Sequence, residues 1–171
     1  MLSKHAKIVD GRYCRPPSDK LTYATMSFVR VVLIDMIAFN VARAAVISIR
    51  YSAVRRQAKI DQLEPEVQIL DYKMQQYKLL PVVALAHACK ASYVALMASY
   101  RDVADDVEVR GDLDRLGELH AMSSGLKALC SDLGSAAIEK CRLACGGHGY
   151  LLISGLPRLY ATTGEAGDRF L

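Results

Sequence analysis

Tryptophan is absent from this 171-residue chain, and aromatic residues make up only 7% of it. Hydrophobic residues nevertheless reach 52%, so aliphatic side chains and alanine must fill the core. No alternation of apolar and polar residues is long enough to predict a strand, and an all-α fold is therefore favoured. The apolar excess also indicates that part of the surface faces a partner, whether another domain, another subunit or a flat cofactor.

Metal-binding and nucleophilic signatures are also missing. The five cysteines are odd in number and form no CxxC pair, which argues against both a disulfide framework and a zinc site. The four histidines have no ligand spacing with carboxylates, and no GxSxG sequence occurs. We expect no metal site, and Cys130, Cys141 and Cys145 are expected to be small buried residues of one helix.

Charge of one sign is not concentrated over most of the chain. The net charge of +4 is spread among alternating acids and bases, which argues against nucleic acid as a partner. A phosphate-bearing ligand fits the modest positive balance equally well. Residues 31–49 have membrane length, but Asp35, Asn40 and Arg43 interrupt them, so a buried helix and no membrane span is expected. The polar start is unlike a signal peptide, and the end is unlike a Ser-Lys-Leu address.

Three long helices and a short fourth, packed as an antiparallel bundle, account for the apolar pattern. The first is expected over residues 21–51 and the second over 67–100, with a kink at Pro81. An acidic link over 101–114 then precedes the third helix, which Gly146 and Gly147 end. One apolar stripe defines the third helix: Leu126, Leu129, Cys130, Leu133, Ala137, Cys141 and Ala144.

Three polar places have two interpretations each. The cations of residues 50–57 either complement a helix C-terminus or capture phosphate. The run 75–78 is either a solvated helix face or a set of donors for a polar cofactor. The sequence Cys-Gly-Gly-His-Gly-Tyr at 145–150 either caps a helix or brings the backbone close to a ligand.

Four linked motifs resemble acyl-CoA oxidases in order and near spacing, over about residues 2–160. They are Lys-Leu-Thr-Tyr-Ala-Thr-Met-Ser-Phe-Val-Arg at 20–30, Ile-Arg-Tyr-Ser-Ala-Val-Arg-Arg-Gln at 49–57, Gln-Ile-Leu-Asp-Tyr at 68–72 with Gln-Gln-Tyr-Lys-Leu at 75–79, and Ala-Cys-Gly-Gly-His-Gly-Tyr at 144–150 with Ser-Gly-Leu-Pro at 154–157. The resemblance implies an FAD-dependent, dimeric, peroxisomal enzyme family. Its members convert acyl-CoA and oxygen to trans-2-enoyl-CoA and hydrogen peroxide in fatty-acid β-oxidation. It further implies that residues 1–19 are a connector resembling the end of a β-domain, 20–160 the first C-terminal helical bundle, and 161–171 a tail unlike the family.

The resemblance also implies residue roles. Arg55 matches an arginine that grips the FAD pyrophosphate from the neighbouring subunit. The other cofactor-binding residues implied are Gln75, Gln76, Tyr77, Lys78, Gly146 and Gly147. The substrate-binding residues implied are Lys20, Leu21, Thr22, Tyr23 and Arg30, which match the segment that contacts acyl-CoA.

The last residues depart from the family pattern. Glu165 is the one nearby carboxylate that resembles the catalytic base, and it comes about five residues early. A base must reach its proton, so a fragment or short isoform that is impaired alone is expected, and whether the chain is itself an enzyme stays open. The alternative is a non-catalytic module that pairs with full-length oxidase subunits, as a homodimer or a heterodimer. A third possibility is an incomplete product with no role of its own.

Overall fold

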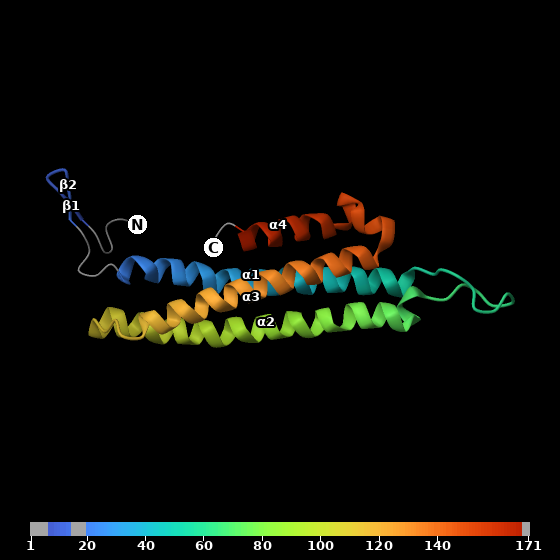
Figure 1. Ribbon diagram of the computed structural model, residues 1–171, viewed down its shortest axis with the longest axis horizontal. Coiled ribbons are helices and arrows are strands. Elements are labelled where there is room, and N and C mark those ends of the chain that lie inside the picture. The colour runs from blue at the N-terminus through green and yellow to red at the C-terminus, as the bar shows by residue number, and fades with distance from the viewer. Residues whose placement is uncertain (1–6, 15–19, 169–171) are drawn as a thin grey trace.

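The computed structural model describes residues 7–14 and 20–168, with the backbone alone for residues 20–25 and 165–168. Three long helices lie side by side along one axis: α2 runs antiparallel to the other two, and α1 and α3 run in the same direction (Figure 1). They are α1 (Lys20–Val54), α2 (Lys73–Asp105) and α3 (Leu116–Ala144). A shorter helix, α4 (Leu156–Asp168), packs along α3 and α1. The predicted all-α bundle with a short fourth helix is confirmed.

A β-hairpin before the bundle was missed by the sequence interpretation. β1 (Lys7–Val9) pairs antiparallel with β2 (Arg12–Cys14). Asp10 and Gly11 form the turn with φ of 50° and 74°, as a two-residue Asp-Gly hairpin turn requires. Three-residue strands that are exposed throughout leave no alternation to detect, so the Asp-Gly pair was the only available signal.

Helix boundaries follow the predicted order with two shifts. α2 begins at Lys73 rather than near residue 67, because Ile69–Asp71 forms a separate 3₁₀ turn, η1. The helix passes through Pro81 and continues to Asp105, and a π-helical turn, η2 (Asp106–Arg110), follows. Much of the predicted acidic link is therefore helical, and Gly111 ends it with φ of 67°.

The buried face of α3 differs from the predicted stripe. Leu129 is 55% exposed and Leu133 is 42% exposed, so both point away from the core. Small and polar residues take their place, including Ser123, Ser131 and Gly134. A Cβ atom on Gly134 would lie 2.6 Å from Cγ2 of Ile37. Helices α1 and α3 approach each other too closely at this contact for a leucine side chain to fit between them. For this reason the predicted buried stripe of α3 was wrong.

Two stretches, Met26–Val54 and Lys73–Arg110, are long and apolar enough to cross a membrane by length and composition alone. Of the most apolar 18-residue part of each stretch, 44% and 28%, respectively, is buried in the bundle. Core helices pass the same test, and α1 and α2 do pack against each other here. The interpretation of residues 31–49 as a buried helix is consistent with Val31, Ile34, Ile37 and Val41, which are all fully buried.

Candidate functional site

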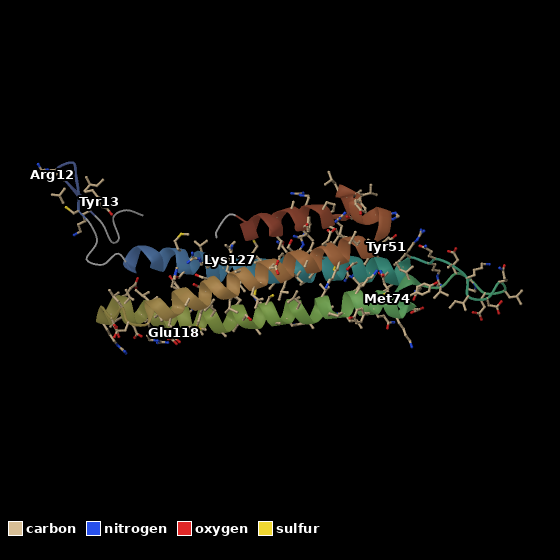
Figure 2. All side chains as sticks on the ribbon, viewed as in Figure 1. Arg12, Tyr13, Tyr51, Met74, Glu118 and Lys127 are labelled. Atoms are coloured by element: carbon tan, nitrogen blue, oxygen red, sulfur yellow. The ribbon has the colours of Figure 1, made fainter. Side chains whose placement is uncertain are left out.

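A pocket of about 510 Å³ lies at one end of the bundle, where α1 and α3 end and α2 begins; we name it the end pocket. Tyr51 and Met74, two of its residues, are labelled at that end in Figure 2. Segments distant in sequence meet here because the antiparallel helices return to the same end. The lining residues are Tyr51, Arg55, Gln57, Ala58, Ile69, Tyr72, Met74, Gln75, Lys78, Leu143, Ala144, Cys145 and Gly146.

Two cations face the end pocket without an acidic partner. Arg55 and Lys78 are both exposed, and in the described part of the chain no carboxylate forms an ion pair with either of them. Among the described residues, those that line the pocket include no aspartate or glutamate. The backbone N–H of Arg55 donates to the carbonyl of Tyr51 at 2.8 Å, so Arg55 also lies where the C-terminal dipole of α1 favours a cation. The cap interpretation and the phosphate interpretation of Arg55 are therefore compatible.

The loop between α1 and α2 is held by its own hydrogen bonds. The backbone N–H of Gln57 donates to the carbonyl of Val67 at 2.9 Å, and that of Val67 donates to Ala58 at 3.0 Å. The guanidinium of Arg56 donates to the carbonyl of Glu66 at 2.9 Å. Neighbouring arginines thus have different tasks: Arg56 fastens the loop, while Arg55 is left to line the pocket.

Four of the seven predicted cofactor residues line the end pocket: Arg55, Gln75, Lys78 and Gly146. The other three do not. Gln76 donates from Nε2 to the carbonyl of Leu70 at 3.0 Å, Tyr77 is 77% exposed, and Gly147 is exposed beside Gly146. On a helix, four consecutive residues cannot share one face, which is why the run 75–78 divides.

The glycines at 146–149 have separate physical reasons. Gly146 has φ of 56°, a left-handed conformation that ends α3 as predicted. Gly149 is buried, and a Cβ atom there would overlap the carbonyl oxygen of Arg142. Chain geometry accounts for both residues without any ligand, whereas Gly147 has neither constraint.

The end of α3 is also fastened by Arg142. Its guanidinium donates two hydrogen bonds to Glu139, at 2.7 and 2.6 Å, and lies 4.3 Å from the ring centroid of Tyr150 and 6.0 Å from that of Tyr160. The hydrogen bonds from Arg142 hold the pKa of the Glu139 carboxyl below its usual value. Sequence interpretation did not single out this contact between α3, the turn η3 (Gly146–Tyr150) and α4.

The predicted substrate residues lie toward the other end of α1. The Arg30 guanidinium is 3.1 Å from Nδ1 of His120 on α3. At a rise of about 1.5 Å per residue, about 36 Å of helix separates Arg30 from Val54, the last residue of α1. Lys20, Leu21, Thr22 and Tyr23 belong to α1 by backbone, and Glu165 belongs to α4, but their side chains lie outside the described residues.

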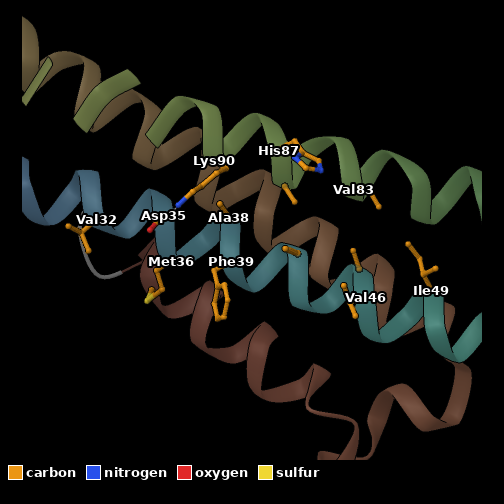
Figure 3. A pocket seen from close by; sticks show the side chains of 13 residues that line it. Val32, Asp35, Met36, Ala38, Phe39, Val46, Ile49, Val83, His87 and Lys90 are labelled. Atoms are coloured by element: carbon orange, nitrogen blue, oxygen red, sulfur yellow. Dashed lines mark hydrogen bonds and ion pairs between the residues drawn. The ribbon is translucent and has the colours of Figure 1, made fainter. Parts of the chain in front are cut away.

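A second hollow, which we name the α1–α2 groove, has a volume of about 590 Å³ (Figure 3). Apolar side chains from both helices form most of its wall, and the aromatic ring of Phe39 is one of them. The ammonium of Lys90 pairs with the Asp35 carboxylate at 2.6 Å at its edge. This groove accounts for part of the exposed apolar surface that composition predicted. Nowhere in residues 7–14 and 20–168 do three or more His, Cys, Asp or Glu side chains cluster in a way that could hold a metal ion.

Comparison with known proteins gives consistent results. The sequence model of the family described as "Acyl-CoA oxidase, C-alpha1 domain" matches residues 23–167. Peroxisomal acyl-coenzyme A oxidase 1 of Homo sapiens is 48% identical over 161 residues, which is 94% of this chain and 24% of that protein. The Bos taurus protein of the same name is 48% identical over 163 residues, or 95% of this chain and 24% of its own length.

Solved structures agree with the sequence relatives. Acyl-CoA oxidase-1 of Caenorhabditis elegans, complexed with FAD and ATP, superposes with a TM-score of 0.86 at 35% identity, over 98% of this chain and 24% of that one. Acyl-CoA oxidase-2 of the same organism, bound with FAD, ascaroside-CoA and ATP, gives a TM-score of 0.88 at 35% identity, over 97% and 25%. The chain spans about a quarter of the length of the relatives that it matches. It belongs to the acyl-CoA oxidase family and corresponds to the C-alpha1 domain.

Proposed function

We propose that this chain is the helical domain with which an acyl-CoA oxidase grips FAD, and that the end pocket receives the pyrophosphate part of that cofactor. The proposal is carried by two cations of the pocket wall, Arg55 and Lys78, which pair with no carboxylate among the described residues. A guanidinium matches phosphate oxygens in pairs, and an ammonium adds a point charge. The rings of Tyr51 and Tyr72 give the same pocket flat apolar surface.

The chemistry follows the family. FAD would supply a hydride acceptor: as a base takes the α-proton of the acyl-CoA, a hydride from its β-carbon would pass to the flavin, which would leave trans-2-enoyl-CoA, and oxygen would then be reduced to hydrogen peroxide. The chain's own contribution in this proposal is binding, with Arg55 and Lys78 on the phosphates and the Lys20–Arg30 segment on acyl-CoA. Glu165 on α4 is the candidate base. The relatives named above are peroxisomal oxidases, and we assign this chain to the same compartment and to β-oxidation.

The separation of the two predicted regions supports a dimer. About 36 Å of helix lies between Arg30 and the end of α1, so the predicted acyl-CoA segment and the proposed pyrophosphate pocket of one chain lie far apart along the bundle. In the proposed assembly, each chain supplies its end pocket to the partner's reaction site. We infer in addition that the chain alone turns over acyl-CoA poorly, because thioester and flavin must be within a few ångströms of each other to react.

Flavin titration tests the cofactor proposal. The purified chain should bind FAD, and Arg55→Gln or Lys78→Gln should each weaken binding roughly fivefold, as expected for the loss of about 1 kcal/mol from an exposed charge pair. Added salt should weaken wild-type binding for the same reason. Lys140→Gln, an exposed site on α3 outside the pocket, is the matched control. If Arg55→Gln and Lys140→Gln bound FAD with equal affinity, the proposal would be wrong.

Turnover and assembly are measured separately. Peroxide release with acyl-CoA should be low for the chain alone, and co-purification with a full-length oxidase should recover a mixed dimer. If the chain alone turned over acyl-CoA as fast as a full oxidase and Glu165→Gln abolished that turnover, the inference that the chain is catalytically impaired would be wrong. A mixed dimer with no turnover would favour the interaction module.

A further inference from the structure

Gln75 has a place in the end pocket that its sequence motif did not reveal. Its side-chain Nε2 donates to Oγ of Ser52 on α1 at 2.9 Å and to the carbonyl of Ala144 on α3 at 2.9 Å. A primary amide nitrogen carries two hydrogens, and these two contacts engage both. One side chain on α2 therefore ties the ends of all three long helices together.

The orientation of the amide is set by its neighbours. Ser52 is fully buried and donates its hydroxyl to the carbonyl of Ser48 at 2.7 Å, so its oxygen is available to accept from Gln75. The Ala144 carbonyl can only accept. A flipped amide would place oxygen against the oxygen of Ala144, which excludes the reverse assignment.

The hydrogen bond from Gln75 to the Ala144 carbonyl holds part of the wall of the end pocket. Ala144 is the last residue of α3, and carbonyls in the last turn of a helix have no partner within that helix. Gln75 supplies the missing donor. Cys145 and Gly146, which follow directly, both line the end pocket, so the donor from α2 sets where this wall lies.

We infer that Gln75 is a positioning residue of the end pocket: its amide fixes the Ala144–Gly146 wall and does not donate to the cofactor phosphates. With both N–H groups engaged, only the carbonyl oxygen Oε1 remains, and an acceptor does not bind a phosphate anion. The inference rests on the proposed function for its ligand, but its structural part can be measured without any ligand.

Gln75→Met keeps the length of the side chain and removes both donors. In the absence of FAD, exchange of the Cys145 amide, which donates to the carbonyl of Arg142 at 3.2 Å, should become about tenfold faster. Amides in the middle of α3 should be unchanged, and FAD affinity should fall severalfold. Gln76→Met is the matched control, because it loses one hydrogen bond within α2 and η1 and leaves α3 untouched. Ser52→Ala, a smaller change, should give the same effect more weakly and serves if Gln75→Met does not fold.

Each outcome decides the inference. Faster Cys145 exchange together with weaker FAD binding supports it. Weaker binding with unchanged exchange means that Gln75 contacts the ligand directly and overturns it, and faster exchange with unchanged binding overturns it as well. If the wild-type chain binds no FAD, the proposed function fails, and exchange alone then decides whether Gln75 fixes the wall.

Discussion

The side-chain Nδ2 of Asn40 lies 3.2 Å from Oγ1 of Thr163, in a buried contact between α1 and α4. Asn40 is 6% exposed and Thr163 is fully buried. A buried amide needs an acceptor, and Thr163 provides one from a helix more than a hundred residues along the chain. This contact fastens α4, the helix that carries the candidate base Glu165, to the core of the bundle.

Replacing Thr163 with valine should therefore destabilise the protein. The amide of Asn40 would lose its acceptor, and the free energy of unfolding should fall by about 1–3 kcal/mol in urea denaturation followed by circular dichroism. Thr162→Val, at an exposed site whose hydroxyl donates only within α4, should change it by less than about 0.5 kcal/mol. Adding Asn40→Leu should recover part of the loss, and no recovery would contradict the assigned contact.

Gly134 is expected to tolerate no side chain. The Cβ atom of Gly134→Ala would lie 2.6 Å from Cγ2 of Ile37 and 3.3 Å from Cγ2 of Val41, both β-branched residues of α1. Overpacking of this kind costs about 1–3 kcal/mol. Gly125→Ala on the same helix meets nothing within 4 Å and should instead gain up to about 1 kcal/mol from helix propensity. Melting temperatures that move in the same direction for both variants would contradict this packing.

Acidic solution should abolish the contribution that Glu139 makes to the free energy of unfolding. Because Arg142 holds the pKa of this carboxyl below its ordinary value of 4.5, the ion pair stabilises the fold above that value, and the contribution is lost as pH falls through the lower folded pKa. Glu139→Gln should be less stable than wild type above pH 4.5, and the difference should close in more acidic solution. Melting temperature against pH measures this, with the exposed Asp132→Asn as control. A difference that widens toward acid would be inconsistent with the pair.

Thiol labelling should distinguish Cys14 from the other cysteines. Cys14 is exposed, and the other four are buried. Burial also raises the pKa of the Cys145 thiol to about 11, so this pocket residue stays protonated at neutral pH and reacts slowly. Mass spectrometry after a short maleimide pulse should find one label on the folded chain and five on the denatured chain. Rapid labelling of Cys145 would show that the wall of the end pocket opens.

Much of the fold could be predicted from the sequence, but the packing could not. The apolar run from residue 21 predicted α1 nearly to its ends, and Gly146 marked the end of α3. The prediction of a buried stripe on α3 was wrong at Leu129 and Leu133. A hydrophobicity pattern carries no information on which residues form the contact between α1 and α3, and Gly134 forms it. Close backbone approach selects small residues at a contact, and which residues make the contact depends on how the partner helix lies.

The sequence by itself determined the order of the long helices and which residues are candidates for a cofactor site, because periodicity, caps and charge are local properties of the chain. Only the tertiary structure decided which of those residues meet. It brought Arg55, Lys78 and Gly146 to one pocket, turned Tyr77 away from it, and engaged both N–H groups of Gln75 in holding three helices together. A side chain's task depends on the partners that the fold leaves within reach of it, and those partners come from distant segments.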